Sequence, residues 1–317
     1  MIVGITVETE SKFKSEVDID NNNSIMYNNE KSFYAVDIFK KDKPYLIAEI
    51  GINHNGELNI AKKLIDAANA CGWDCVKFQK RDPDVCVPQE QKQVRRNTPW
   101  GEMSYIEYKH RMEFQQKEYE VIDAYCKQKP IDWTVSVWDL NSLDFAIKFR
   151  VPFIKIPSAQ FTNKELIKAI AEKDVFILLS TGMTSWEMID DTVNILNQKN
   201  SRYALLHCNS TYPAPHHELN LNVIPEMKKR YDCMVGYSGH EYDIEPTVLA
   251  VTLGAEIIER HITLDNNMWG TDQKSSLEVH AMDLLKKKIN GISKMMGKPE
   301  KIICESEKLA MEKLRSK

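Results

Sequence analysis

Short apolar segments alternate with amphipathic helical segments between residues 44 and 300, and this rhythm limits the fold more than any other feature. The predicted strands are 45–52, 75–79, 133–138, 153–158, 175–181, 203–210, 234–237 and 257–261. The predicted helices are 58–70, about 105–127, 141–149, 163–171, 186–196, about 222–231, 245–254 and about 278–296. Short strands that are apolar along their length are typical of parallel sheets covered on both faces.

Eight parallel strands alternating with eight helices over about 250 residues is the count and size of a (β/α)8 TIM barrel. A doubly wound open sheet is the alternative, but no G-x-G-x-x-G motif follows any predicted strand and no phosphate-loop motif occurs. We therefore predict an α/β fold, with a TIM barrel over residues 43–300. Residues 1–42 are predicted to be an N-terminal extension, either a hairpin or disordered, and residues 301–317 a C-terminal helical tail.

The composition of the 317-residue chain excludes several classes of partner. The formal net charge of −4 gives no reason to expect binding to nucleic acid or to an anionic membrane. No apolar run reaches the ~18 residues that span a bilayer, and the acidic N-terminus does not resemble a signal peptide. The seven cysteines are scattered, without the paired spacing of a zinc site. We expect reduced thiols and a cytoplasmic protein.

Two neighbouring predicted strands between residues 234 and 265 both lead to a histidine. The first reaches His240 through a Ser-Gly pair, and the second ends at His261. A right-handed crossover between parallel strands would place both imidazoles side by side at one end of the sheet. Either histidine alone would be read as a structural residue. Together, beside Ser238, Glu259 and Asp272, they predict a site for a divalent metal ion.

Two lysines, Lys77 and Lys155, follow apolar residues of predicted strands. Each could simply reach solvent, and the serines at neighbouring strand ends could be caps. Because lysine is seldom buried without a partner, two lysines at one barrel mouth ringed by serines instead indicate an anion site. Glu49 would lie near both lysines and should stay ionised unless desolvation outweighs them. The sequence thus predicts metal-assisted carbon–carbon bond chemistry, or hydrolysis, on a phosphorylated or carboxylated substrate.

Seven motifs give the chain a specific resemblance. They are AEIGINHNG (48–56), VKFQ (76–79), FIKIPS (153–158), LSTGM (179–183), LLHCNSTYPAP (205–215), GYSGH (236–240) and ERHITLD (259–265). In order and content they resemble the N-acetylneuraminate (sialic acid) synthase family, which includes the pseudaminic and legionaminic acid synthases. The resemblance covers residues 44–300, nearly the whole predicted barrel.

The resemblance implies a transferase that condenses phosphoenolpyruvate with an open-chain amino-sugar aldehyde. The products would be a 2-keto-3-deoxy nonulosonic acid and phosphate, which leaves by C–O cleavage. It also implies a divalent ion on His240 and His261 that polarises the aldehyde, Mn²⁺ by expectation, with Mg²⁺ or Co²⁺ as alternatives. Glu49, Lys77 and Lys155 would join the histidines as catalytic residues. The implied substrate-binding residues are Ser158, Ser180, Ser210, Tyr212, Ser238, Asp272 and Gln160.

The chain departs from the family pattern mainly where the sugar would bind. Ser158 is preceded by Pro157, where glycine is usual, and is followed by Ala159 and Gln160, where the family has glycine and a carboxylate. Ser136 is followed by Val-Trp rather than Thr-Pro. The chain stops at Lys317, so we expect it to lack the family's C-terminal antifreeze-like domain, which lends an arginine to the partner subunit. We expect an intact phosphoenolpyruvate half, an altered sugar half and a homodimer.

Two other functions remain open at this point. One is a related condensation with a shorter or differently substituted aldose. The other is a non-catalytic barrel that binds a sugar or a partner. Two inward-facing lysines, which cost desolvation energy when buried, argue against a non-catalytic barrel.

Overall fold

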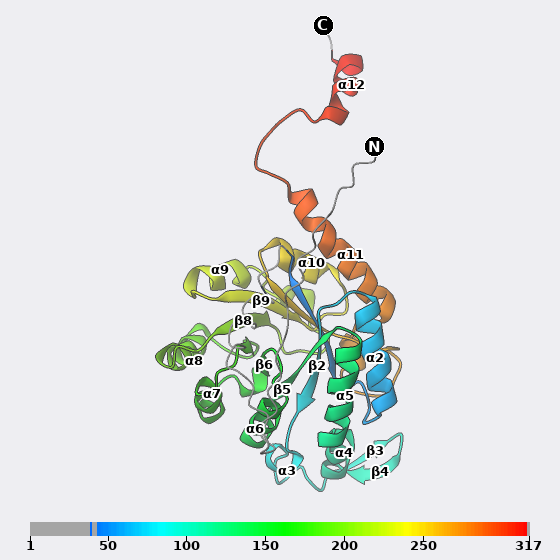
Figure 1. Cartoon of the computed structure of the whole chain (residues 1–317), viewed down its shortest axis with the longest axis vertical. Helices are drawn as coiled ribbons and strands as arrows, with labels where there is room; N and C mark the ends of the chain where they lie inside the picture. Colours follow the sequence, from blue (N-terminus) through cyan, green and yellow to red (C-terminus); the bar gives the residue numbers. More distant parts are fainter. Residues whose placement is uncertain (1–38, 40–42, 316–317) are drawn as a thin grey trace, which may run out of the picture.

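A computed structural model describes residue 39 and residues 43–315 of the chain, and the structural statements below concern these residues. Eight parallel strands close into a barrel in the order β1-β10-β9-β8-β7-β6-β5-β2, which confirms the predicted (β/α)8 fold (Figure 1). The barrel strands are β1 Tyr45–Gly51, β2 Cys75–Lys80, β5 Asp132–Val137, β6 Ile154–Ile156, β7 Ile177–Ser180, β8 Tyr203–Cys208, β9 Met234–Gly239 and β10 Ile257–His261.

Helices surround the barrel and cover the outer face of every strand (Figure 1). The helices around the barrel are α2 Leu58–Ala70, α3 Pro83–Cys86, α4 Tyr105–Met112, α5 Gln116–Gln128, α6 Leu140–Lys148, α7 Lys164–Ala171, α8 Trp186–Gln198, α9 Val223–Arg230, α10 Glu245–Thr252 and α11 Val279–Met296, and α12 Glu305–Leu314 follows α11 along the chain. None of the described helices is both long and apolar enough to cross a membrane. All seven cysteines are free thiols.

The stretch between β2 and β5 differs from the prediction. The expected single helix over 105–127 is two helices, because α4 ends at Met112 and α5 begins with its own capping box between Gln115 and Glu118. Glu113, in the break, turns inward and accepts a hydrogen bond from Lys80 at 2.8 Å. Residues 81–104, for which no helix or strand was predicted, contain α3 and an antiparallel hairpin, β3 Arg95–Thr98 with β4 Gly101–Ser104.

Side chains alternate between the barrel interior and the helix layer along each strand, as the pleat of a strand requires. On β10, Ile257 and Glu259 face inward, while Ile258 packs in the large core between strands and helices. The interior is apolar at the amino ends of the strands, where Phe39 and Phe153 lie. Inward positions become polar at the carboxyl ends, so the fold separates a stable base from a reactive mouth.

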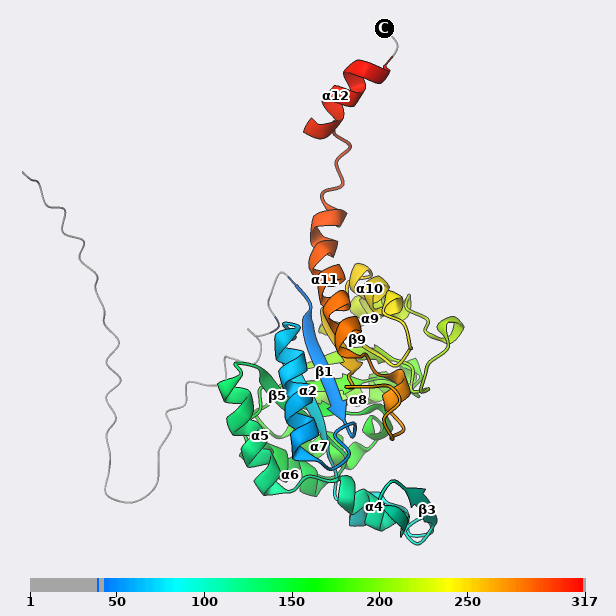
Figure 2. The same ribbon diagram turned by 90° about the vertical axis from the view of Figure 1, so that its right-hand side faces the viewer.

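Phe39 closes the base of the barrel. Its ring centroid lies 4.9 Å from that of Tyr45, 5.4 Å from Phe153 and 5.0 Å from Phe176, and the side chain is 4 % exposed. Phe39 belongs to the predicted N-terminal extension, and the choice between a hairpin and disorder for residues 1–42 otherwise lies outside the described residues. The predicted C-terminal tail contains α12, which stands away from the barrel beyond α11 (Figure 2).

A fully buried ion pair ties β10 to the loop after β9 on the outer side of the barrel. Arg260 Nη1 lies 2.8 Å from Glu241 Oε1, donates to Thr247 Oγ1 at 2.7 Å and to the Asp243 carbonyl at 3.0 Å. Both charged side chains are 0 % exposed. Because Arg260 precedes one predicted site histidine and Glu241 follows the other, this pair fixes the spacing of the two histidines.

We predict that Arg260→Met destabilises the protein by about 3–5 kcal/mol, because Glu241 would remain buried without a counter-charge. Arg230→Met is the matched control, since Arg230 pairs with Asp190 at the surface and should cost less than about 1 kcal/mol. Urea unfolding followed by circular dichroism measures both free energies. Equal losses in the two variants would contradict the structural role given to Arg260.

Candidate active site

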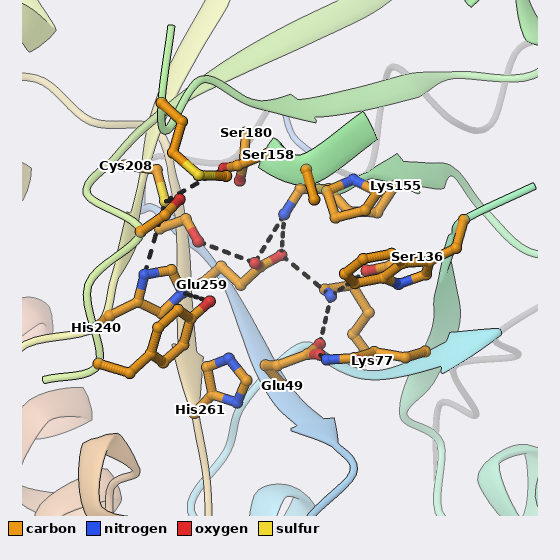
Figure 3. Close-up of a pocket in the computed structure, with 18 residues that line it drawn as sticks. Glu49, Lys77, Ser136, Lys155, Ser158, Ser180, Cys208, His240, Glu259 and His261 are labelled. Atoms are coloured by element: carbon orange, nitrogen blue, oxygen red, sulfur yellow. Dashed lines mark hydrogen bonds and ion pairs between the residues drawn. The ribbon is translucent and has the colours of Figure 1, made fainter. Parts of the chain in front are cut away.

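One cavity of about 180 Å³ opens at the carboxyl ends of the barrel strands (Figure 3). Its lining includes ten of the twelve predicted site residues, all but Gln160 and Asp272: Glu49, Lys77, Lys155, Ser158, Ser180, Ser210, Tyr212, Ser238, His240 and His261. These residues come from strands spread around the whole ring, and the barrel brings them together because its parallel strands all end at this mouth.

Four charged side chains form a buried network in the cavity (Figure 3). Lys77 pairs with Glu49 and donates to Ser136 Oγ at 2.6 Å. Lys155 donates to both carboxylate oxygens of Glu259 at 2.7 Å, and the second oxygen of Glu259 also lies 3.8 Å from Lys77 Nζ. Two ammonium groups therefore lie beside two carboxylates in one buried network.

Burial and ion pairing shift the pKa values of Glu49 and Glu259 in opposite directions. Burial raises the pKa of Glu49 to about 7, and nearby Lys77 offsets only part of that effect. The pKa of Glu259 is lowered although burial opposes this, because Lys155 and Lys77 stabilise its charge. Desolvation thus affects the pKa of Glu49 more than the lysines do. The sequence analysis predicted an ionised Glu49 unless desolvation outweighed the lysines, and this exception applies here. A carboxyl group that titrates near neutral pH suits proton transfer.

The two histidines lie side by side, with ring centroids 5.5 Å apart. His240 Nδ1 faces the Asn209 carbonyl at 2.6 Å, and its Nε2 lies 2.9 Å from the Tyr212 hydroxyl. His261 Nδ1 is buried without a hydrogen bond, 3.8 Å from Asp272 Oδ2. Burial lowers the pKa of His261 to about 3, which leaves a neutral imidazole with a lone pair to offer.

The donor set at the histidines fits a divalent ion held by two imidazoles. Despite burial, the neighbouring Cys208 and the Asn209 carbonyl raise the pKa of His240, so protons would compete with a metal ion for this imidazole more strongly than for an ordinary histidine. Among the described residues no group of three or more His, Cys, Asp or Glu side chains is arranged to hold a metal. Water or substrate would have to complete the coordination, and the metal site stays a prediction.

Hydroxyl groups gather on the side of the cavity formed by β6, β7 and β8. Ser158 Oγ accepts a hydrogen bond from the Gly182 backbone N–H at 3.1 Å, and Ser180 Oγ is buried with no partner. A side chain at Gly182 would collide with the hydroxyl groups of Ser158 and Ser210, so glycine is required there. The unpartnered Ser180 hydroxyl and the ammonium group of Lys155 form a suitable surface for phosphate or carboxylate oxygens.

Two predicted substrate-binding residues lie away from the cavity lining. Gln160, in the 3₁₀ turn η1 (Ser158–Gln160), accepts a hydrogen bond from Asn163 Nδ2 at 2.9 Å and so faces the start of α7. Asp272 lies behind His261 and accepts a hydrogen bond from the Thr271 hydroxyl at 2.7 Å. Their predicted contacts with the sugar therefore need a movement of these side chains or a substrate that reaches past the cavity.

Several lining residues were not assigned a role from the sequence. Glu259, Gln79 and Ser136 were visible at strand ends, whereas Cys208 and Trp138 were missed. Strand alternation could have found Cys208, because Leu206 faces the interior two residues earlier. Cys208 Sγ lies 3.7 Å from His240 Nδ1 and accepts a hydrogen bond from Ser158 at 3.6 Å, so it links the histidine and serine sides of the cavity.

Comparison with known proteins agrees with the site. The sequence matches the NeuB family over residues 64–301. It is 37 % identical over 270 residues to N,N'-diacetyllegionaminic acid synthase of Campylobacter jejuni, covering 84 % of this chain and 81 % of that protein. It is 34 % identical over 273 residues to human N-acetylneuraminate-9-phosphate synthase, covering 85 % of this chain and 76 % of that protein.

A solved structure shows the same similarity. N-acetylneuraminic acid (sialic acid) synthetase from Leptospira borgpetersenii, in complex with citrate, superimposes with a TM-score of 0.76 at 30 % identity. The alignment covers 86 % of this chain and 91 % of that structure. The resemblance predicted from the seven motifs is thus confirmed, and the chain belongs to the NeuB family of sialic acid synthase-like enzymes.

Proposed function

We propose that the protein condenses phosphoenolpyruvate with an open-chain amino-sugar aldehyde to give a nonulosonic acid and inorganic phosphate. The observation that carries this proposal is the cavity itself, where two buried lysines and several serine hydroxyls adjoin two neighbouring histidines. The lysines and serines suit a small polyanion, and the two histidines suit an aldehyde oxygen. Membership of a family whose named relatives are nonulosonic acid synthases supports the same reaction.

The reaction makes one carbon–carbon bond and breaks one carbon–oxygen bond. Carbon 3 of phosphoenolpyruvate attacks carbon 1 of the sugar, whose carbonyl oxygen takes up a proton. Water adds at carbon 2, and the bond from carbon 2 to the bridging oxygen breaks, so that phosphate leaves with that oxygen. Lys77 and Lys155 hold the carboxylate and phosphate in place, and Glu49 accepts the proton of the attacking water.

The divalent ion would be held by His240 and His261, with Mn²⁺ the expected ion and Mg²⁺ or Co²⁺ alternatives. When bound, it would polarise the aldehyde carbonyl, a Lewis-acid contribution of several kcal/mol. His240 Nδ1 faces the Asn209 carbonyl, which leaves Nε2 for the ion, so the Tyr212 hydroxyl, 2.9 Å from Nε2, would have to move aside when the ion binds. Asp272 Oδ2 lies 3.8 Å from His261 Nδ1, beyond hydrogen-bond distance, and would act on that imidazole through its charge.

The position of Gln160 supports a differently substituted acceptor sugar as a second candidate. Gln160 stands where the family pattern has a carboxylate, and its side chain is turned toward Asn163 rather than into the cavity. The sugar contact expected at this position therefore changes in both charge and direction. A related aldose remains the second candidate function, and it would use the same phosphoenolpyruvate chemistry.

We also propose a cytoplasmic location for this activity. All seven cysteines are unpaired, and Cys71, Cys75 and Cys126 are buried as free thiols. Unpaired buried thiols are typical of proteins kept in a reducing compartment.

Phosphate release tests the proposed function. The purified protein, Mn²⁺ and phosphoenolpyruvate are incubated with a panel of aldoses that includes N-acetylmannosamine and 6-deoxy diacetamido hexoses, and the product is identified by mass spectrometry. We expect phosphate release that depends on the aldose, with a product that gains the mass of a pyruvate unit. Reactions without an aldose are the control, and release with none of the panel would favour a non-catalytic barrel.

We predict that His240→Ala lowers kcat/KM by at least about 100-fold, because the aldehyde would lose its electrophilic partner. The same variant should bind Mn²⁺ far more weakly in isothermal titration calorimetry. His216→Ala is the matched control, since His216 is exposed and pairs with Asp243 outside the cavity. Unchanged Mn²⁺ affinity in His240→Ala would remove the metal assignment.

We predict that the pH profile of kcat/KM reflects the ionisation of Glu49. If its ionised form accepts a proton from water, kcat/KM rises with pH below about 7 and levels off above that value. Glu49→Gln should lower kcat by about 10²–10⁴-fold and abolish this limb of the profile. A residual activity that keeps the same limb in Glu49→Gln would show that another group titrates there.

A further inference from the structure

The side-chain amide of Gln79 lies between a carboxylate and a guanidinium group. Its nitrogen, Nε2, donates to Glu49 Oε1 at 3.2 Å, and its oxygen, Oε1, accepts a hydrogen bond from the Arg81 guanidinium. A guanidinium group has donors only, so it must face the oxygen of an amide and not its nitrogen. Arg81 therefore selects the orientation in which Nε2 of Gln79 points toward Glu49.

Arg81 is itself held in place from two directions. Its guanidinium carbon lies 4.3 Å from the centroid of the Trp138 ring, and its backbone N–H donates to Glu113 Oε1 at 3.1 Å. Within residues 39 and 43–315, no carboxylate forms an ion pair with the Arg81 guanidinium. The side chain of Gln79 is thus the polar group on which this guanidinium acts.

The aromatic support of Arg81 comes from a residue that departs from the family pattern. Trp138 lines the cavity and stands where that pattern has proline. A guanidinium group is attracted to the face of an indole ring, whereas proline offers no aromatic face. The position of Arg81 in this chain therefore depends on one of the departures found in the sequence.

The two oxygens of Glu49 have different partners. Lys77 pairs with Oε2, as Figure 3 shows, and Gln79 donates to Oε1. The terminal torsion of a glutamate side chain is broad, so one partner alone leaves the plane of the carboxylate free to turn. Two partners on different oxygens fix that plane, and each oxygen keeps a second lone pair that can accept a proton.

The backbone of β1 leaves room for the contact between Glu49 and Gln79. A Cβ atom at Gly51 would lie 3.1 Å from Glu49 Oε1 and 3.2 Å from Gln79 Nε2, closer than ordinary van der Waals contact. Gly51 has φ +54°, and the register between β1 and β2 shifts between Glu49 and Gly51. A glycine at the strand irregularity thus keeps the carboxylate and the amide within reach of each other.

We infer that Arg81 and Gln79 are positioning residues that fix the carboxylate plane of Glu49 for proton transfer from water. This inference rests on the proposed function, in which Glu49 accepts the proton of the attacking water. A base is effective only when its oxygen lies within hydrogen-bond reach of that proton, so a carboxylate that turns away loses rate. Arg81 acts through Gln79, and Trp138 acts through Arg81.

A double-mutant cycle tests whether Arg81 acts through Gln79. With saturating phosphoenolpyruvate, Mn²⁺ and the best aldose of the panel, we expect Arg81→Met and Gln79→Leu each to lower kcat about tenfold. The KM for phosphoenolpyruvate should change by less than about threefold, and the double variant should also lose about tenfold in kcat. A loss of about 100-fold in the double variant would show independent effects and overturn the inference, as would an effect of Arg81→Met on KM alone.

Two further variants separate positioning from a general structural effect. Arg81→Lys should keep a kcat at least about threefold above that of Arg81→Met, because an ammonium group also has donors only and still selects the oxygen of Gln79. Arg111→Met is the matched control, since Arg111 lies 4.3 Å from the Trp100 ring centroid and pairs with Glu57. It should change kcat by less than about twofold. Equal losses in Arg81→Met and Arg111→Met overturn the inference, and so do equal losses in Arg81→Lys and Arg81→Met.

Nuclear magnetic resonance separates this inference from the proposed function. If no aldose releases phosphate from phosphoenolpyruvate, the proposed function fails, but the hold of Arg81 on the amide can still be measured. In protein labelled with ¹⁵N-glutamine, the Gln79 side-chain signal is the one missing from Gln79→Leu. The inference expects its Nε2 protons to exchange with water about tenfold faster in Arg81→Met than in the wild type, and within about twofold of the wild type in Arg111→Met. Equal exchange rates in Arg81→Met and the wild type overturn it.

Discussion

The buried pairing of Lys77 and Lys155 with Glu49 and Glu259 is the interaction on which the mouth of this barrel depends. Removing a charge from water costs several kcal/mol, so four charges can share a dry cavity only when each has a close partner. Lys155 meets both oxygens of Glu259 at 2.7 Å, and Lys77 bridges Glu49 and Ser136. A substrate polyanion meets two lysines already fixed in place, which reduces the reorganisation that binding requires.

The barrel supplies this arrangement through strand register. Glu49 lies beside Lys77 on one side and beside His261 on the other, because β1 pairs with both β2 and β10. Ser136 lies beside Lys155 across β5 and β6. On the outer face the Arg260–Glu241 pair fixes the chain between the two histidines. The alternation of inward and outward side chains along each strand thus determines both the charge network at the mouth and the apolar packing at the base.

Much of the fold and of the candidate site could be predicted from the sequence. The features that could not be predicted depend on contacts that form only in the folded chain. The alternation of strand and helix patterns predicted the closed barrel, and the residues at the ends of the predicted strands include most of the cavity lining. The break at Glu113 escaped because a local capping box and a long-range contact to Lys80 override helical periodicity. The pairing of Lys155 with Glu259 escaped because they lie 104 residues apart and meet only once the ring closes. The direction of Gln160 depends on a local hydrogen bond to Asn163 that spacing alone does not reveal.

We propose that this cavity adds water to carbon 2 of phosphoenolpyruvate and releases phosphate by C–O cleavage. The most direct measurement uses phosphoenolpyruvate labelled with ¹⁸O in the bridging position, followed by mass spectrometry of both products. We expect the label to leave in inorganic phosphate and the new keto oxygen to come from water. Label retained in the sugar acid would mean P–O cleavage and would contradict the account.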